Sequence, residues 1–436
     1  MYHSKIWHPY TKHSAIGDIP VIERGEGVHL HAADGTTFID GISSWWCVNL
    51  GHAHPRVTEA IQAQAATLPH SILGNLSHPN AVELSAQLAA LMPTPDRHVL
   101  YASDGASAIE AALKIAVQYF HNLRANDPSL PERNQFVALT DPYHGDTMGA
   151  VSVGYMESFH KPVKALTFPT HRIPTPVRRS VDDGASCRAS LAVLDGLFER
   201  AEQEGTIAAV VLESLCQGAS GMRMYCPGFL AAVAERCERH GALLVCDEIA
   251  MGFGRTGTMF AFEQAGIDPD IVCLGKGITN GSLPLSATVV KDRIYETFND
   301  TSAPHNPNGE DRTFYHGHTF AGNPIAAAAA LATLAVYRED NIMATVSERA
   351  AFLERELTAR FADHPAVTEV RCLGMIGALQ LDKTKEEMAA IRDRIRAAGV
   401  LLRPLGKCLY LMPPLVSSEA TLVEIMDAMA AGLSAE

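Results

Sequence analysis

The stretch Leu243–Gly281 reads LLVCDEIAMGFGRTGTMFAFEQAGIDPDIVCLGKGITNG and contains two short apolar runs, each followed closely by a charged residue. Leu243–Asp247 and Ile271–Leu274 are rich in Leu, Val and Ile without polar alternation, which predicts strands buried on both faces of a parallel sheet. Asp247 ends the first run, and Lys276 follows the second by two residues. Because ligands bind outside the carboxyl ends of parallel strands, we expect Asp247 and Lys276 to share a site.

Similar apolar runs flank this stretch and predict further strands of the same sheet: His98–Ala102, Phe136–Thr140, Ile207–Glu213 and Ser286–Val290. Segments with apolar residues on one helical face lie between them and predict covering helices: Ala106–Phe120, Leu191–Gln203 and Phe229–His240. This alternation is typical of a mostly parallel sheet with helices on its faces. We therefore expect an α/β fold with a large domain over residues 46–324.

The two ends of the chain have a different pattern. Residues 325–436 alternate charged amphipathic helices with short strands, which predicts a smaller α+β domain. Residues 1–45 contain short strand-like runs, and we expect them to form an arm that joins this smaller domain. Pro169–Ala185 and Asn299–Arg312 are rich in turn-forming residues and predict surface loops. The elements predicted in the smaller domain are the helices Ser347–Phe361, Lys385–Ala398 and Ser418–Leu433 and the strands Val367–Arg371, Met375–Leu381 and Val400–Pro404.

Composition excludes several classes of protein. The 436 residues include 35 basic and 49 acidic side chains, so the formal net charge is −14 and no overall basic surface is expected for nucleic acid or an anionic membrane. The longest apolar run, Ile325–Val336, is shorter than the ~20 residues of a membrane-spanning helix. The first residues contain no apolar core of a secretory signal. The 9 cysteines include no CxxC pair, which indicates a reduced, cytoplasmic protein.

Asp247 and Lys276 are the residue types that would bind a cofactor with a carbonyl group and a cationic ring nitrogen. A lysine with an apolar wall behind it has a lowered pKa, and its neutral amine can attack a carbonyl group. A carboxylate at the neighbouring strand end can pair with a cationic ring nitrogen, as pyridoxal phosphate requires. Taken alone, each residue is more often a structural feature of an ordinary strand end.

Two further segments suit a flat, phosphorylated cofactor. The sequence SDGASAIE begins the helix after the first predicted strand, and the free N–H groups at Gly105 and Ala106 would cradle a phosphate. An ordinary Ser or Asp cap explains the same segment equally well. Tyr143 follows another predicted strand and would lie over a ring, although buried tyrosines are common in turns. The 19 histidines form pairs such as His52 and His54 without HExxH spacing, so we expect no metal site.

Together these segments resemble one family, the class III aminotransferases of pyridoxal-phosphate-dependent fold type I. The resemblance covers nearly the whole chain. Its most specific motifs are Asp247-Glu248, the GFGRTG of residues 252–257, and Gly275-Lys276, with Lys276 standing 29 positions after Asp247. It implies a large domain on a mostly parallel sheet of seven strands, a smaller α+β domain built from both chain ends, and a homodimer with shared active sites.

The resemblance implies pyridoxal 5′-phosphate as cofactor and assigns three expected catalytic residues. Lys276 would bind the cofactor covalently and move a proton during the reaction. Asp247 would pair with the ring nitrogen, and Tyr143 would lie against the ring. Glu213 and Arg255 could form an ion pair nearby, although paired structural charges explain them equally well.

The resemblance also implies where the cofactor's phosphate binds. Gly105 and Ala106 are expected to hold it, with Thr319 of the partner subunit reaching over. His318 beside that threonine would either add a donor to the phosphate or simply occupy the surface. The family usually has Gly in the phosphate turn where this chain has Asp104, and we expect the Asp104 side chain to point away from the phosphate.

Shorter segments narrow the resemblance to members that transfer an amino group from S-adenosyl-L-methionine to 8-amino-7-oxononanoate in biotin biosynthesis. These segments are IWHPYT (Ile6–Thr11), SSWW (Ser43–Trp46), YHGDT (Tyr143–Thr147), QGASGMRMY (Gln217–Tyr225) and RPLGK…LYLMPP (Arg403–Pro414). The reaction of those members is ping-pong and yields 7,8-diaminononanoate. Arg403 would bind the substrate carboxylate, and Trp46 is expected in the core. The residues implied to bind substrate are Tyr10, Trp45, Tyr143, Gly317 and Arg403.

Other functions on the same sequence pattern stay open. One is a class III ω-aminotransferase with another amino donor or acceptor, for example lysine as donor, although the WHPY and SSWW segments count against it. A second is an aminomutase or a decarboxylase on the same scaffold. A third is a cofactor-binding protein without activity, which the presence of both Lys276 and Asp247 disfavours. We expect an aminotransferase.

Overall fold

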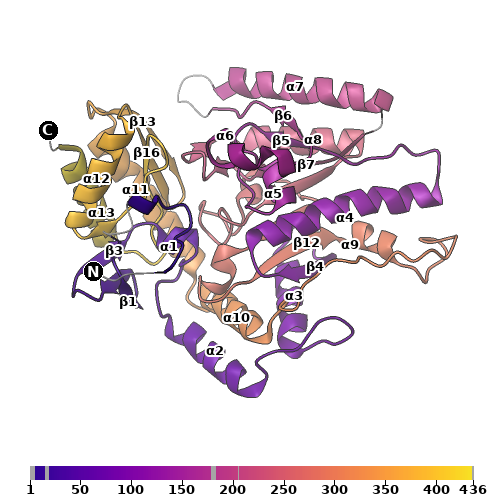
Figure 1. Ribbon diagram of the computed structural model, residues 1–436, viewed down its shortest axis with the longest axis horizontal. Coiled ribbons are helices and arrows are strands. Elements are labelled where there is room, and N and C mark those ends of the chain that lie inside the picture. The colour runs from indigo at the N-terminus through magenta and orange to yellow at the C-terminus, as the bar shows by residue number, and fades with distance from the viewer. Residues whose placement is uncertain (1–4, 15–18, 178–182, 205, 435–436) are drawn as a thin grey trace.

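The computed structural model describes residues 5–14, 19–177, 183–204 and 206–434, and its largest feature is a seven-stranded sheet (Figure 1). The strand order is β4-β12-β11-β10-β7-β5-β6, and β12 alone runs antiparallel to its neighbours. This confirms the mostly parallel sheet expected from the sequence. The strands are β4 (Arg97–Ala102), β5 (Gln135–Leu139), β6 (His171–Ile173), β7 (Ile207–Glu213), β10 (Leu243–Asp247), β11 (Ile271–Leu274) and β12 (Ser286–Lys291).

Helices cover both faces of this sheet because its central strands are apolar on both sides. All residues of β7 are buried, and alternate ones enter different apolar clusters, Val210 in one and Val211 in the other. The second cluster contains α4 (Gly105–Asn126) and α5 (Met148–Val153). The first contains residues of the other helices, which are α3 (Pro79–Ala90), α7 (Asp183–Glu204), α8 (Pro227–His240) and α10 (Pro324–Glu339).

The segment predicted as the loop Pro169–Ala185 contains regular structure at both ends. His171–Ile173 forms the edge strand β6, and α7 begins at Asp183; residues 178–182 lie outside the described part. The edge strand escaped prediction because it has three residues, two of them polar, and pairs with β5 on one side only. The second predicted loop, Asn299–Arg312, contains no helix or strand, as expected.

The two ends of the chain are joined through backbone hydrogen bonds. β3 (Thr37–Asp40) pairs in parallel with β15 (Val400–Leu401), and the same sheet continues through β2 (His29–Ala32) to β1 (Ile22–Glu26). A second small sheet contains β13 (Val367–Leu373), β14 (Ile376–Leu381) and β16 (Cys408–Leu411). The helices beside it are α11 (Ile342–Phe361), α12 (Lys385–Ala397) and α13 (Glu419–Ser434).

The proposed limits 1–45, 46–324 and 325–436 remain a prediction. The helix α10, which follows the second limit, packs mainly on α3 and on α2 (Pro55–Thr67), both in the large domain. Within the described residues no helix has the length and apolarity to cross a membrane. The remaining elements are α6 (Glu157–His160), η2 (Lys161–Leu166), β8 (Cys216–Gln217), β9 (Arg223–Met224), η3 (Ala261–Ala265), η4 (Lys276–Thr279), α9 (Asp292–Tyr295) and η5 (Glu296–Phe298).

The segment α1 (Ser43–Trp46) is a left-handed turn. The φ angles of Ser43, Ser44, Trp45 and Trp46 are 49°, 45°, 75° and 73°. Its backbone N–H groups still reach four residues back, with Trp46 N donating to Ile42 O at 2.8 Å. Left-handed backbone costs a non-glycine residue roughly 1–2 kcal/mol, and four such residues in succession persist only where surrounding contacts hold them.

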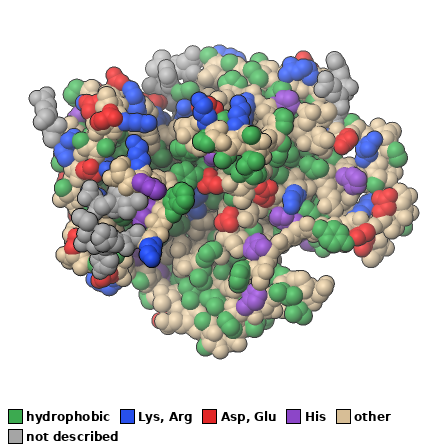
Figure 2. All heavy atoms as spheres, in the orientation of Figure 1, with side chains coloured by type: hydrophobic (Ala, Val, Ile, Leu, Met, Phe, Trp, Pro, Cys, Tyr) green, Lys and Arg blue, Asp and Glu red, His purple; other side chains and the backbone are tan. Residues whose placement is uncertain are grey.

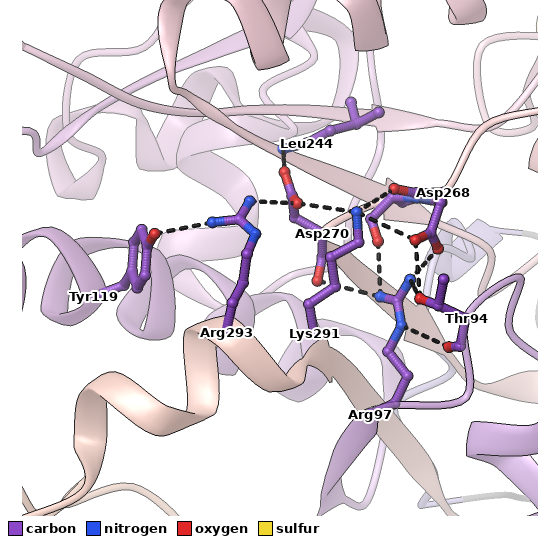
Figure 3. Close-up of polar contacts among 9 residues, drawn as sticks. Thr94, Arg97, Tyr119, Leu244, Asp268, Asp270, Lys291 and Arg293 are labelled. Atoms are coloured by element: carbon purple, nitrogen blue, oxygen red, sulfur yellow. Dashed lines mark hydrogen bonds and ion pairs between the residues drawn. The ribbon is translucent and has the colours of Figure 1, made fainter. Parts of the chain in front are cut away.

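A polar network lies at the amino-terminal edge of the parallel strands (Figure 3). Asp270, just before β11, accepts the N–H of Leu244 at 3.0 Å and pairs with Arg293 at 2.6 Å and Lys291 at 3.4 Å. Arg97 at the start of β4 pairs with Asp268. These bonds tie the starts of β4, β10 and β11 and the end of β12 together, which fixes their register.

Candidate active site

A cavity of ≈ 690 Å³ opens at the opposite edge of the sheet, outside the carboxyl ends of the parallel strands. Figure 2 shows a recess near the middle of the drawn face, with acidic side chains on one side of it. Its walls come from the ends of β4, β5, β7, β10 and β11, as expected for a ligand site in such a sheet. The lining residues are Trp46, Cys47, Ser103–Ala106, Tyr143–Thr147, Glu213, Asp247, Ile249–Met251, Lys276 and Gly281–Leu285.

Lys276 enters the cavity from the end of β11. Its backbone has a φ of 43°, a conformation that is unfavourable for a residue with a side chain. Burial lowers the pKa of the Lys276 amine, against the charge of Asp247, which raises it. The ammonium position lies 5.4 Å from the centroid of the Trp46 ring. A lysine with a lowered pKa supplies neutral amine for attack on a carbonyl carbon.

Asp247 is buried at the end of β10 and is oriented by two hydrogen bonds. Its Oδ2 lies 2.7 Å from Nδ1 of His144, and its Oδ1 accepts the N–H of Ile249 at 3.0 Å. The second ring nitrogen of His144, Nε2, is buried without a hydrogen-bond partner in the described structure. Sequence reasoning missed this use of His144. Its only signal was the YHGDT segment, because the histidine and its partner are 103 positions apart.

Glu213 faces the same cavity from the end of β7, and the ion pair with Arg255 considered above does not form. Its carboxylate accepts the backbone N–H groups of Tyr143 at 3.1 Å and Gly218 at 2.9 Å. Burial, and then the charge of Asp247, raise the pKa of Glu213 to about 8. Arg255 instead donates to the carbonyl of Pro413 at 2.5 Å and to other groups near α1. The ion-pair hypothesis was wrong because Arg255 is buried beside α1.

The first turn of α4 presents small residues to the cavity. Asp104 caps this helix, with its Oδ1 accepting the N–H of Ser107 at 2.9 Å. Gly145 lies so close that a Cβ there would stand 2.3 Å from the Cβ of Ala106. A Cβ at Gly105 would stand 2.8 Å from Ile249. Ser103–Ala106 line the cavity and are only partly buried or exposed, so this helix N-terminus is accessible from the cavity, which is the arrangement that binds phosphate groups.

Two tyrosines share one carboxylate at the cavity mouth. The hydroxyl of Tyr10 donates to Oδ1 of Asp146 at 2.5 Å, and that of Tyr143 donates to Oδ2 at 3.1 Å. Burial and the hydrogen bond to Asp146 raise the pKa of Tyr10 to about 12, and burial raises that of Tyr143 further. Both phenols are therefore neutral donors. Asp146 also lies 3.5 Å from Nε2 of His160.

Arg403 lies beside these tyrosines and covers Trp45. Its guanidinium carbon is 4.1 Å from the centroid of the Trp45 ring, and Nη2 donates to the carbonyl of Tyr10 at 3.2 Å. The rings of Tyr10 and Trp45 meet edge to face at 5.8 Å. The structure therefore brings together Tyr10, Trp45, Tyr143 and Arg403, four of the residues expected to bind substrate. Trp46 was expected in the core; it is buried, but it also lines the cavity.

Gly317, His318 and Thr319 do not reach this cavity within one chain. All three are exposed, and His318 Nδ1 accepts the N–H of Phe320 at 3.2 Å. Gln217 is buried near the cavity, with its Nε2 donating to Thr140 and its Oε1 without a hydrogen-bond partner in the described structure. In the described part of the chain no three His, Cys, Asp or Glu side chains gather as a metal site.

Comparison with known proteins identifies the family. The model of the class III aminotransferases matches residues 13–433, and the chain belongs to this family. An adenosylmethionine-8-amino-7-oxononanoate aminotransferase from Synechococcus elongatus is 41% identical over 98% of this chain and 98% of its own length. The enzyme of that name from Nitratidesulfovibrio vulgaris is 39% identical over 96% of this chain and 78% of its own length.

Solved structures of the same fold confirm the architecture. The adenosylmethionine-8-amino-7-oxononanoate aminotransferase of Methanocaldococcus jannaschii superposes with a TM-score of 0.89, at 32% identity over 98% of this chain and 96% of that one. An amine transaminase from an uncultivated Pseudomonas species, solved in the PLP-bound internal aldimine form, superposes with a TM-score of 0.90 at 31% identity, over 99% of both chains. The predicted fold and family are therefore confirmed.

Proposed function

We propose that this class III aminotransferase transfers an amino group from S-adenosyl-L-methionine to 8-amino-7-oxononanoate and makes 7,8-diaminononanoate for biotin. Relatives at 41% and 39% identity carry the name of this activity. The observation that carries the proposal to the substrate is the cluster at the cavity mouth, where Arg403 lies over Trp45 beside Tyr10. A cation, an indole and a phenol suit a chain-like substrate that ends in a carboxylate.

The cavity fits pyridoxal 5′-phosphate, which supplies an electron sink when bound. The donor set matches this group: a buried carboxylate at Asp247 for the ring nitrogen, an amine of lowered pKa at Lys276, and a helix N-terminus at Gly105 and Ala106 that lines the cavity, for phosphate. The Tyr143 side chain would cover the ring. The two hydrogen bonds on Asp247 hold its carboxylate in place to keep the ring nitrogen protonated.

Lys276 acts as the base and acid of both half-reactions. With the cofactor bound, its amine would take the proton from the carbon that bears the donor's amino group and hold it for return, and in the second half-reaction it would move a proton in the reverse direction. Burial lowers the pKa of this amine, which favours the neutral form that can accept a proton. His144 holds the carboxylate of Asp247 through its Nδ1.

The substrate chain lies between Tyr10 and Trp45 in this proposal, and its carboxylate binds Arg403. The planar guanidinium can bind a carboxylate through two parallel hydrogen bonds. Tyr143 contributes its face to the ring and its hydroxyl to the wall of the slot.

The proposed enzyme is a cytoplasmic homodimer. Gly317, His318 and Thr319 would enter the cavity of the partner subunit, since they are exposed and remote from the cavity of their own chain. Phe320 and Tyr315 beside them are 61% and 79% exposed, which suits a covered surface.

A two-step absorbance experiment tests the function. The purified holoenzyme is mixed with S-adenosyl-L-methionine, lysine or a simple amine, and the cofactor band is followed; the aminated enzyme is then mixed with 8-amino-7-oxononanoate. We expect S-adenosyl-L-methionine to discharge the band and the keto acid to restore it. Discharge of the band by lysine alone would identify lysine as the donor instead. Failure of 8-amino-7-oxononanoate to restore the band would refute the proposed acceptor and favour another ω-aminotransferase.

A further inference from the structure

The left-handed turn Ser43–Trp46 places its two tryptophans in different parts of the site. Trp45 is 38% exposed and lies at the mouth under Arg403, whereas Trp46 is 5% exposed and faces Lys276. Consecutive side chains on a helical turn point in different directions, so one short turn supplies both the mouth and an inner wall. The orientation of each indole therefore depends on the turn keeping its unfavourable backbone.

Asp40 holds this turn from the side of the N-terminal sheet. Its Oδ2 accepts the hydroxyl of Ser44 at 2.7 Å, and its Oδ1 accepts the N–H of Ile42 at 3.3 Å. The Asp40 side chain is buried and is not among the residues that line the cavity. Its hydrogen bonds go to the turn and its flank, not to the cavity.

His52 fixes the carboxylate of Asp40. Its Nε2 lies 2.9 Å from Oδ2 of Asp40, and its backbone exchanges two hydrogen bonds with Gly27 at 2.7 and 3.1 Å. Burial would raise the pKa of Asp40, but the hydrogen bonds from His52 and Ser44 outweigh it and lower that pKa below its usual value. Asp40 is thus an ionised acceptor held at a fixed place.

The other side of the turn is held separately. The hydroxyl of Ser43 donates to the carbonyl of Met412 at 2.8 Å and accepts from Nη2 of Arg255 at 3.1 Å. Loss of the Asp40 contact would therefore free the turn at Ser44 and leave it anchored at Ser43. The expected result is a changed orientation of the indoles without unfolding of the domain.

We propose that Asp40, fixed by His52, is a positioning residue for substrate selectivity: through Ser44 it keeps the strained turn that directs Trp45 to the cavity mouth and Trp46 to its inner wall. The inference deepens the proposed function and rests on it for the identity of the substrate. Its structural part, the coupling of Asp40 to the indoles, holds for any acceptor that binds between Tyr10 and Trp45.

The test uses the full-length holoenzyme with the variants Ser44→Ala and Asp40→Asn. Ser129→Ala is the matched control, because Ser129 donates to Asp127 at 2.6 Å in an exposed loop that does not line the cavity. The chain has 3 tryptophans, so a Trp7→Phe background leaves fluorescence that reports on Trp45 and Trp46 alone. Acrylamide quenching is measured without substrate, and KM and kcat are measured with 8-amino-7-oxononanoate.

We expect both variants to increase quenching and to raise KM for the keto acid about tenfold, which is about 1.4 kcal/mol, while kcat changes less than KM and the control changes neither. Ser44→Ala guards against a folding defect, since it removes one hydroxyl and leaves Asp40 and His52 paired. Quenching and KM equal to those of the control in both variants would overturn the proposal. A wild-type enzyme that ignores 8-amino-7-oxononanoate, with quenching still increased in the variants, would refute the proposed function and support the coupling.

Discussion

Replacement of Arg403 by alanine tests the substrate assignment most directly. The guanidinium lies 4.1 Å from the Trp45 ring centroid and donates to the carbonyl of Tyr10, so it is already oriented when the substrate arrives. A charge-assisted contact to a carboxylate contributes roughly 1.5–3 kcal/mol. At ~1.4 kcal/mol per factor of ten, Arg403→Ala should weaken binding of 8-amino-7-oxononanoate about tenfold to a hundredfold.

The affinity lost in Arg403→Ala has a second contribution, and a further variant distinguishes it from the carboxylate contact. Cation–π contact with Trp45 contributes roughly 0.5–2 kcal/mol, depending on solvent exposure, and alanine removes it together with the carboxylate contact. Arg403→Lys keeps the positive charge but loses the planar fork, so we expect it to recover only part of the affinity.

Titration of the aminated enzyme with the keto acid measures these affinities. Affinity for the cofactor should be unchanged in both variants, because Arg403 is absent from the cavity lining around Lys276 and Asp247. Equal affinity for the keto acid in wild type and Arg403→Ala would refute the reasoning. The substrate assignment would then depend on Tyr10 and Trp45 alone.

Four other outcomes are expected. Borohydride reduction of the holoenzyme and peptide mapping should find the cofactor on Lys276; a label on another lysine would contradict the assignment. Asp247→Asn should still bind cofactor but slow both half-reactions about 10²- to 10³-fold, the scale of losing one oriented electrostatic partner, and near-normal stopped-flow rates would show that the carboxylate is dispensable. The pKa of Glu213 is about 8 in the folded chain against 4.5 for the free side chain; the folded state therefore takes up a proton, and its contribution to stability, full below pH 4.5, is lost as the pH rises through 8. Urea unfolding of the apoprotein at several pH values should show this fall in the free energy of unfolding, and a smaller fall for Glu213→Gln. An equal pH dependence in the two proteins would show that Glu213 does not cause the fall. Asp270→Ala should lower the free energy of unfolding by about 1–3 kcal/mol, because it leaves the buried N–H of Leu244 without an acceptor. Asp382→Ala, which removes an exposed pair with Lys407, should change it by less than ~1 kcal/mol; equal effects would show that the network adds no stability.

The central sheet could be predicted from the sequence because buried parallel strands are continuous apolar runs. Ile207–Glu213 and Ile271–Leu274 have the same limits in the structure as in the prediction. Lys276 and Asp247 were also predicted to share a site, since the carboxyl ends of neighbouring parallel strands meet at one edge.

Features that depend on contacts between distant segments could not be predicted. The left-handed turn contains no glycine, the residue that usually marks such backbone, and it is held by Asp40, Met412 and Arg255. His144 finds its partner across 103 positions of sequence. Burial of Arg255 beside α1 likewise has no local signal, which is why its ion pair was misassigned.

The network of Arg97, Asp268 and Asp270 aligns the sheet at the edge opposite the residues proposed to bind the acceptor. It lies at the start of β11, a strand of four residues that is about 13 Å long when extended, and Lys276 lies just beyond the other end of that strand. Changes at Tyr10, Trp45 or Arg403 remove none of its bonds. A descendant of this chain can therefore acquire a different acceptor at one edge of the sheet while the opposite edge preserves the alignment that delivers the lysine amine.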